Sequence, residues 1–198
     1  MPRQKAMEKR HAMMSAAKAL FLNNSYTDVS MTKISEKAGI SKNTLYCHFP
    51  NKEALYMAVL SEHWNQDSIP QIEANDARNM SVVLKDFATD VMRFLYHKDT
   101  MAFYRTLVAE VVRFPTLTEA IVTESTGPAM SNLKSYFAAQ TDKSPAEVDR
   151  AARYFFGMLY VDTFWHVLVG FRKPYTEDQL ESHINNVVRF FAESFDNI

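Results

Sequence analysis

The segment "AGISKNTLYCHFPNKEAL", residues 38–55, gathers on a short stretch of chain several side chains that can bind a polar partner. An asparagine amide can pair with adenine through two hydrogen bonds, and a lysine ammonium group can reach guanine. Within residues 42–49, Leu45 and Phe49 are the strongly apolar side chains that can hold this stretch in place. These residue types favour contact with nucleic acid. The polar and aromatic side chains in question are Lys42, Asn43, Thr44, Tyr46 and His48.

The signals for helix starts and stops around this segment predict a helix-turn-helix. Ser30 can cap a helix at 31–38, and Gly39 can take the left-handed conformation that ends it. Ser41 can cap a second helix at 42–49, which is followed by Pro50 and Asn51. Two short helices joined by a tight turn form the motif that places its second helix in the major groove of DNA.

The second of these helices is too short to be stable by itself. We expect Ile34, Leu45 and Phe49 to form a small core with a first helix at 5–23, whose apolar residues recur on one face. The polar face of the second helix is then not needed for packing. It is free to enter a major groove, which admits one helix.

Helical periodicity continues along the chain and predicts an all-α fold. Only 4 glycines and 7 prolines among 198 residues argue against a sheet-rich fold, which needs many tight turns. A helix is expected to begin at Lys52 and to run to Pro70 or a little before. The further helices are expected at 79–97, 99–113, 116–138, 145–171 and 176–196.

Charge is divided unevenly along a chain whose net charge is −1. Residues 1–60 hold nine Lys or Arg and four Asp or Glu, a net charge of +5, whereas the remainder holds 13 basic and 19 acidic residues. Only the first third is therefore expected to meet a polyanion. The single cysteine, Cys47, excludes an internal disulfide and favours a reducing, cytosolic compartment.

Residues 21–60, "FLNNSYTDVSMTKISEKAGISKNTLYCHFPNKEALYMAVL", resemble the DNA-binding domain of the tetracycline-repressor-like (TetR/AcrR) family of bacterial transcriptional regulators. The T-L-Y-x-H-F-x-x-K-E-x-L spacing and the preceding A-G-I-S turn carry the resemblance. It implies a three-helix DNA-binding domain at 1–50 and a larger helical ligand-binding and dimerisation domain at 51–198. It also implies a cytoplasmic repressor that binds a palindromic double-stranded DNA operator as a homodimer and is released by a small hydrophobic ligand.

The resemblance assigns DNA contacts by position. Base contacts are expected from Lys42, Asn43 and Cys47, and phosphate or sugar contacts from Thr44, Tyr46 and His48. Lys52 resembles a phosphate-contacting lysine, and Thr32 and Lys33 resemble residues that touch the DNA backbone or base edges. The family usually has glycine where Ser25 stands, and it has other residue types at positions 43 and 47, so the operator sequence cannot be taken from a relative.

Apolar stripes in the body of the chain suggest a ligand pocket, although plain core packing explains such stripes equally well. Glu110 and Asp162 fall among apolar residues, where a carboxylate is costly unless it is paired. Each carboxylate either pairs with another side chain of the protein or contacts a ligand. Asp162 and His166 are four residues apart on one helix face, which favours a simple hydrogen bond between them over a metal site. The expected lining residues are Phe87, Phe103, Leu107, Phe155, Leu159 and Trp165, with Glu110 or Asp162 as the polar anchor.

The last two helices are expected to form a dimer interface. Residues 154–171 are apolar around the whole helix circumference, which predicts a helix buried on both sides. Asp162 and His166 near its middle argue against a membrane span. The final helix carries an apolar stripe from Leu180 to Phe195. One side would pack on the body and the other on a second copy of the chain.

Two other function classes compete with a ligand-responsive repressor. An enzyme is disfavoured because the chain has no G-x-S-x-G, no H-E-x-x-H and no phosphate-binding glycine loop, and no cofactor or metal is expected. A DNA-binding regulator without a small-molecule ligand, controlled by a protein partner or by its abundance, stays open. A cavity of several hundred Å³ would favour the ligand, whereas a filled body would favour the alternative.

Overall fold

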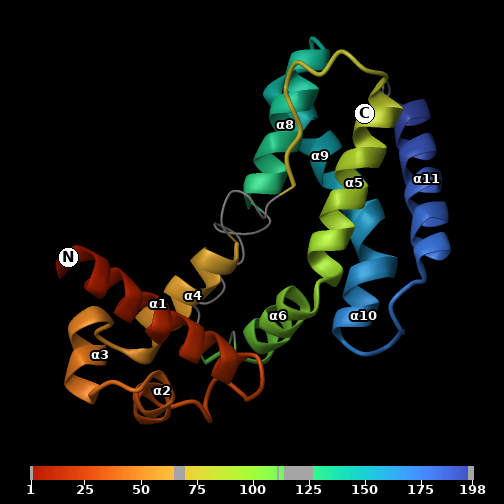
Figure 1. The fold of residues 1–198 in the computed structure, drawn as a ribbon. Helices are drawn as coiled ribbons and strands as arrows, with labels where there is room; N and C mark the ends of the chain where they lie inside the picture. Colours follow the sequence, from red (N-terminus) through yellow and green to blue (C-terminus); the bar gives the residue numbers. More distant parts are fainter. Residues whose placement is uncertain (1, 65–69, 111, 114–126, 196–198) are drawn as a thin grey trace. The chain divides into compact units, whose positions relative to one another are not determined.

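The computed structural model describes residues 2–64, 70–110, 112–113 and 127–195, with side chains from residue 7 onward, and these residues form helices and connections without a strand (Figure 1). The expected all-α fold is confirmed. None of the described helices is long and apolar enough to cross a membrane. The helices are α1 (Pro2–Phe21), α2 (Met31–Ala38), α3 (Lys42–His48), α4 (Lys52–His63), α5 (Met80–Tyr96), α6 (Lys98–Glu110), α8 (Gly127–Gln140), α9 (Pro145–Tyr160), η2 (Val161–Trp165), α10 (His166–Leu168) and α11 (Glu177–Ser194).

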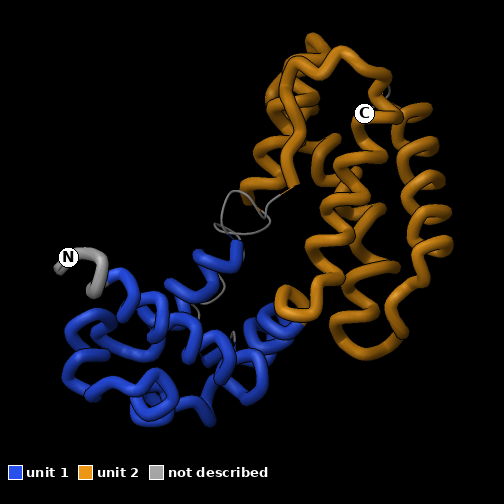
Figure 2. The backbone as a smooth tube through the Cα atoms, viewed as in Figure 1, with its two compact units in different colours: residues 1–65, 102–124 blue, residues 66–101, 125–198 orange. Residues whose placement is uncertain are grey.

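The chain folds into two compact units, coloured separately in Figure 2. Unit 1 comprises Met1–Asn65 and Ala102–Glu124, and unit 2 comprises Gln66–Met101 and Ser125–Ile198. The division therefore falls within α6, whose residues from Ala102 onward belong to unit 1. The functional boundary expected between residues 50 and 51 stays a prediction. By packing, α4 belongs to the same unit as α1, α2 and α3.

Aromatic side chains fill the centre of unit 1. The Tyr56 ring on α4 is fully buried and meets the ring of Phe21 at the end of α1 at a centroid distance of 4.7 Å, edge to face. It also meets Tyr26, in the loop before α2, at 5.1 Å and Phe103 on α6 at 6.2 Å. Because edge-to-face contacts are favourable beyond their burial, this cluster ties α1, α4 and α6 into one core.

Unit 2 is built around α5, α8, α9 and α11, with α11 packed on both α5 and α9. Two capping boxes set the helix starts: Ser144 with Glu147 opens α9, and Thr176 with Gln179 opens α11. The rings of Phe155 on α9 and Phe191 on α11 meet edge to face at 5.1 Å. Both side chains are fully buried, so they join the two helices at the centre of the unit.

The segment 145–171, expected as one continuous helix, departs from that expectation in two ways. It changes to a π-helical turn at η2 and ends after α10, where Gly170 takes φ +76°. The hydroxyl of Thr163 donates to the carbonyl of Leu159, and the Tyr96 hydroxyl donates to the carbonyl of Thr163 at 3.3 Å. A helix can depart locally from α geometry where a side-chain hydroxyl bonds to a carbonyl of its own helix, or where a donor from another helix does so.

The other helices differ from the sequence-based bounds mainly at their ends. The fourth helix was expected to approach Pro70, but α4 ends at His63, where the backbone N–H of Trp64 donates to the carbonyl of Leu60. Of the helix expected at 116–138, residues 116–126 lie outside the described residues, and α8 begins at Gly127. The expected ranges for α2 and α5 agree with the structure to within a residue.

We predict that Phe103→Ala destabilises unit 1, although residue 103 is far in sequence from α1–α4. Removing a fully buried ring costs about 3–5 kcal/mol. Hydrogen exchange should therefore show lower protection of the α4 amides, because Phe103 contacts Tyr56. The matched control is Val108→Ala on the same helix, an exposed position expected to change stability by about 0.5 kcal/mol or less. Unchanged α4 protection in Phe103→Ala would contradict the packing described.

Candidate nucleic-acid interface

Local capping positions the two helices of the helix-turn-helix. The hydroxyl of Ser30 accepts from the backbone N–H of Lys33 at 3.2 Å, and α2 ends at Gly39, which takes φ +67°. The hydroxyl of Ser41 accepts from the backbone N–H of Thr44 at 3.1 Å and so starts α3. The turn between the helices therefore requires the left-handed residue that the sequence supplies.

Helix α3 is held by few contacts and leaves most of its surface to solvent. Leu45 is the buried residue of α3, and Phe49, which directly follows the helix, is also buried. The guanidinium of Arg10 on α1 lies 4.7 Å from the centroid of the Phe49 ring. This cation–π contact joins the end of α3 to α1. Helix α3, with seven residues, is thus held by its caps and by two apolar side chains.

Six of the side chains expected to contact DNA lie on α3, and four of these are exposed. Lys42, Asn43 and Cys47 are exposed, Tyr46 is 49% exposed, and Thr44 and His48 are half-buried. On α2, Thr32 is half-buried, and the Lys33 ammonium donates to the carbonyl of Asp28 at 2.9 Å. These positions are compatible with the roles expected from the sequence, and their contacts with DNA stay predictions.

Lys52 differs from the others because its ammonium group has three partners inside unit 1. It donates to the carbonyl of Tyr26 at 2.7 Å and to that of Val29 at 2.9 Å, and it lies 4.2 Å from the centroid of the Tyr26 ring. Burial lowers the pKa of Lys52, while the charges of Glu110 and Asp28 act in the opposite direction. Lys52 therefore anchors the loop before α2 to the start of α4.

Sequence reasoning did not single out this anchoring role or the two tyrosines beside it. Burial raises the pKa of Tyr26 to about 12, and it also raises the pKa of Tyr56. Both phenols therefore stay neutral at physiological pH, as their burial requires. The acceptor carbonyls of Lys52 lie 23 and 26 residues away in sequence, so no local pattern could have predicted them.

The residues expected to line a ligand pocket are divided between the two units. Phe103, Leu107 and Glu110 are buried in unit 1, where Phe103 also contacts the His63 ring at 5.0 Å. One carboxylate oxygen of Glu110, Oε2, is buried without a hydrogen-bond partner among the described residues. The charge of Glu110 acts on Tyr26, Tyr56 and Lys52, so the carboxylate belongs to the same polar region.

The remaining candidates lie in unit 2. Phe87 is buried against Phe156, at a centroid distance of 6.1 Å, and Phe155 and Leu159 are also core residues. Trp165 is 48% exposed. The ligand-lining role of these residues stays a prediction.

Asp162 has structural partners, as one of the two sequence-based explanations required. Its Oδ2 accepts from the Tyr175 hydroxyl at 2.8 Å and from the Arg172 guanidinium at 3.1 Å. The hydrogen bond from Tyr175 lowers the pKa of Asp162, and the Arg172 charge acts in the same direction. Oδ1 of Asp162 lies 3.3 Å from Nδ1 of His166. Within the described residues, no group of three or more His, Cys, Asp or Glu is placed to hold a metal ion.

An apolar face on unit 2 is left uncovered. Residues 154–171 were expected to pack on the body of the chain on one side and on a second copy on the other; in the single chain the second side is exposed, and its packing on a second copy stays a prediction. We call it the α9–α11 face and define it by the exposed side chains Tyr154, Val161, Trp165 and Val169 on the α9–α10 segment and Phe190 on α11. Large apolar side chains that are exposed together are typical of an interaction surface.

Two sequence-family models match the chain. One, described as bacterial regulatory proteins of the tetR family, matches residues 13–59, and the other, the C-terminal domain of AefR-like transcriptional repressors, matches residues 82–196. The chain belongs to the TetR family. The resemblance seen in residues 21–60 is thereby confirmed, and the match extends through most of unit 2.

Individual relatives of this TetR-family chain support the same placement. The HTH-type transcriptional activator FasR of Mycolicibacterium smegmatis is 41% identical over 56 residues, which are 28% of this chain and 26% of FasR. A solved TetR-family regulator from Mesorhizobium loti superposes with a TM-score of 0.84 at 26% identity, covering 95% of this chain and 96% of that one. The flavonoid-responsive regulator FrrA superposes with a TM-score of 0.78 at 27% identity, covering 94% and 96%. The chain aligns with only about a quarter of the length of FasR.

We predict that Lys52→Met lowers the stability of unit 1 of this TetR-family protein. Methionine keeps the length of the side chain but leaves the carbonyls of Tyr26 and Val29 without their charged donor. Loss of hydrogen bonds to a charged group costs about 1.5–3 kcal/mol each, less where water can replace the donor. Urea unfolding followed by unit 1 hydrogen exchange measures the change.

The matched control for this prediction is Lys42→Met, at an exposed position on α3. Its stability should change by about 0.5 kcal/mol or less. If both variants are equally stable and both lose only DNA affinity, Lys52 acts as a phosphate contact and not as an anchor.

Proposed function

We propose that this TetR-family protein is a transcriptional repressor that binds a palindromic DNA operator as a homodimer and is released from it by a small hydrophobic ligand. The observation that carries the DNA-binding part is α3, a capped helix whose polar residues Lys42, Asn43 and Tyr46 are exposed and not used for packing. The net charge of +5 on residues 1–60 supports the same surface, because a basic patch attracts the phosphate backbone. Such a regulator acts in the cytoplasm, where the bacterial chromosome lies.

The roles proposed for individual residues follow from their chemistry. The amide of Asn43 can pair with adenine through two hydrogen bonds, and the ammonium group of Lys42 can reach guanine N7 and O6. Thr44, Tyr46 and His48 are proposed to hold phosphate or sugar groups, which fix the helix in the groove without specifying sequence.

Dimerisation is proposed because one helix with seven residues reads too few base pairs for specific control. A two-fold axis repeats the recognition helix over a second half-site, so a symmetric operator and a symmetric dimer match each other. The α9–α11 face supplies a surface for this, because its apolar side chains are about half exposed or more.

Release by a ligand is proposed partly from similarity. The family model that matches residues 82–196 is that of the C-terminal domain of AefR-like transcriptional repressors. The similar regulator FrrA is named for its response to flavonoids. Within this chain, the buried Glu110 carboxylate in unit 1 is a candidate polar anchor. The alternative is a DNA-binding regulator without such a ligand, and the buried aromatic core of unit 2 is compatible with it.

We predict that selection from random DNA returns an inverted repeat and that two α3 variants affect it differently. Asn43→Ala should relax the preference at one base pair of each half-site, at a cost of about 1–3 kcal/mol. Tyr46→Ala should weaken binding to all sequences to a similar extent. Asn185→Ala, exposed on α11, is the matched control and should bind normally. An asymmetric selected site, or normal binding by both α3 variants, would exclude the proposed operator contacts.

We predict that at least one member of a panel of flavonoids and other hydrophobic compounds releases the operator. If a ligand prefers the form that does not bind DNA, operator DNA must weaken ligand affinity by the same factor, so titrations with and without DNA check each other. Glu110→Gln should weaken cationic compounds more than neutral ones while operator binding persists. Failure of every compound to bind would favour control by a protein partner or by abundance.

A further inference from the structure

The first turns of α1 carry most of the net positive charge of the N-terminal region. Residues 1–10 hold four Lys or Arg and one Glu, a net charge of +3, whereas residues 11–60 hold five and three, a net charge of +2. The helix begins at Pro2, and its side chains are exposed from Met7 to Ala12. More than half of the charge that attracts a polyanion therefore lies on a segment outside the helix-turn-helix.

The helix-turn-helix itself supplies few cations for phosphate groups. Of its four lysines between residues 31 and 52, Lys33 and Lys52 donate to backbone carbonyls, at 2.9 Å and 2.7 Å. Lys42 is proposed to face the bases. Threonine and tyrosine hydroxyls can hydrogen-bond to phosphates but do not neutralise them, and much of the affinity for DNA comes from neutralised phosphates that release counterions. Tight operator binding therefore calls for basic residues outside this motif.

The basic residues of α1 lie on the face that the rest of the helix turns towards the core. From Met13 onward that face is buried, with Met13 fully buried and Met14 6% exposed. Lys9 and Arg10 precede these two methionines by four residues, about one helical turn, so they continue the same face. Both are exposed. Charged residues of an amphipathic helix usually take the opposite, solvated face, so charge in this position indicates an anionic surface beside the domain.

Arg10 fixes this segment beside the end of α3. Its guanidinium lies 4.7 Å from the centroid of the Phe49 ring, and Phe49 directly follows α3. Lys5 lies four residues before Lys9. Arg3 lies seven residues before Arg10, so the helix register carries the basic face on for about 10 Å. Because the major groove is about 12 Å wide, phosphates run along both edges of any helix that enters it, close to a basic segment at the end of that helix.

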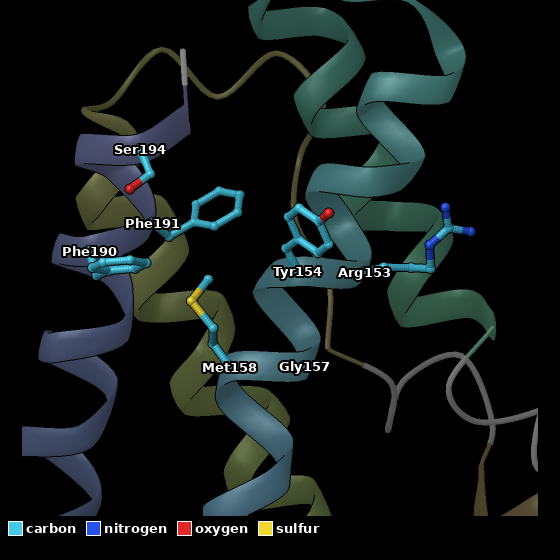
Figure 3. A pocket seen from close by; sticks show the side chains of 7 residues that line it. All are labelled: Arg153, Tyr154, Gly157, Met158, Phe190, Phe191 and Ser194. Carbon is cyan, nitrogen blue, oxygen red and sulfur yellow. The ribbon is translucent and has the colours of Figure 1, made fainter. Parts of the chain in front are cut away.

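The basic residues of unit 2 are placed differently. Arg153 lines the pocket between α9 and α11 that Figure 3 shows, and it pairs with Asp149, as does Lys134. Arg172 pairs with Asp162 at 3.1 Å. Residues 61–198 hold 13 basic and 19 acidic residues, so carboxylates outnumber cations there. The field of the chain therefore directs a polyanion to the first turns of α1 and not to unit 2.

We propose that the first turns of α1 are a second DNA-contacting surface, in which Arg3, Lys5 and Lys9 bind phosphates at the edge of the groove that α3 enters. Arg10 packs on Phe49 and holds this surface beside α3. The contact carries no sequence information, because the phosphate groups are the same at every base pair. This inference rests on the proposed operator binding and adds where phosphates of the operator are neutralised.

The decisive variant is the triple variant Arg3→Gln/Lys5→Gln/Lys9→Gln, which keeps good helix formers and removes three charges. Its affinity for the selected operator is measured by fluorescence anisotropy between 50 and 300 mM salt. Each lost phosphate contact lowers the slope of log affinity against log salt by about 0.9, so the slope should become shallower by about 2.7 for each bound protomer. At the low-salt end, Kd should rise by about 10-fold or more, equally for operator and unrelated DNA.

Two further variants keep the result independent of folding. Lys9→Gln, a single change at an exposed position, should make the slope shallower by about 0.9 for each protomer. Arg3→Lys/Lys5→Arg/Lys9→Arg conserves the three charges and should bind with the slope of the original chain. Circular dichroism of each variant should show the helix content of the original chain.

The matched control removes the same charge from unit 2. Arg93→Gln/Lys98→Gln/Lys173→Gln alters three exposed positions there and should leave the salt slope unchanged. If this control lowers the slope as much as the triple variant, the effect is one of overall charge and the α1 contact is overturned.

The outcomes separate this inference from operator binding itself. If the original chain selects no DNA, the proposed function fails and this inference fails with it. If the original chain binds an operator but the triple variant keeps its salt slope, operator binding stands and only the α1 contact is overturned. A changed base preference in the triple variant would also overturn it, because phosphate contacts specify no base. A shallower slope in the triple variant and in Lys9→Gln, with both charge controls unchanged, supports the assignment.

Discussion

The buried ring of Tyr56 is the contact on which the arrangement of unit 1 depends. It touches Phe21, Tyr26 and Phe103, which come from three separate segments of the chain. Helix α3 has too few buried side chains to fix its own position, so the frame around it must be rigid. The aromatic cluster and the Lys52 ammonium supply that frame, because together they fix the loop that leads into α2.

Local features of the sequence were sufficient to predict the helix-turn-helix. Ser30, Gly39 and Ser41 act within four residues of the helix ends that they determine, and the structure has them in those roles. Lys52 was expected to face DNA, and the resemblance to a family gave no sign that its donors are used inside the fold. Its acceptors are brought near by tertiary packing, which no short window of sequence contains.

The same limit applies to the body of the protein. Periodicity identified the apolar residues of 145–171 but not which side of the helix would be covered, because that depends on the position of α11. Periodicity also did not predict the π-helical turn. The turn is accompanied by hydrogen bonds from the Thr163 hydroxyl and from the Tyr96 hydroxyl, and Tyr96 is 67 residues away from Thr163 in sequence. Within one chain, the segment therefore contributes to the core on one side and is exposed on the other, where packing on a second copy stays a prediction.

The division of the chain within α6 has a consequence for the order of biosynthesis. A ribosome completes residues 1–65 before it makes Phe103 and Tyr104, whose rings contact Tyr56 and Trp64 in unit 1. During that interval the large aromatic side chains of α4 lack part of their cover and are exposed to chaperones, proteases and other nascent chains. All of α5, which belongs to unit 2, is translated in between. The core of unit 1 is therefore begun by residues 1–65 but is not complete until Phe103 and Tyr104 have been synthesised.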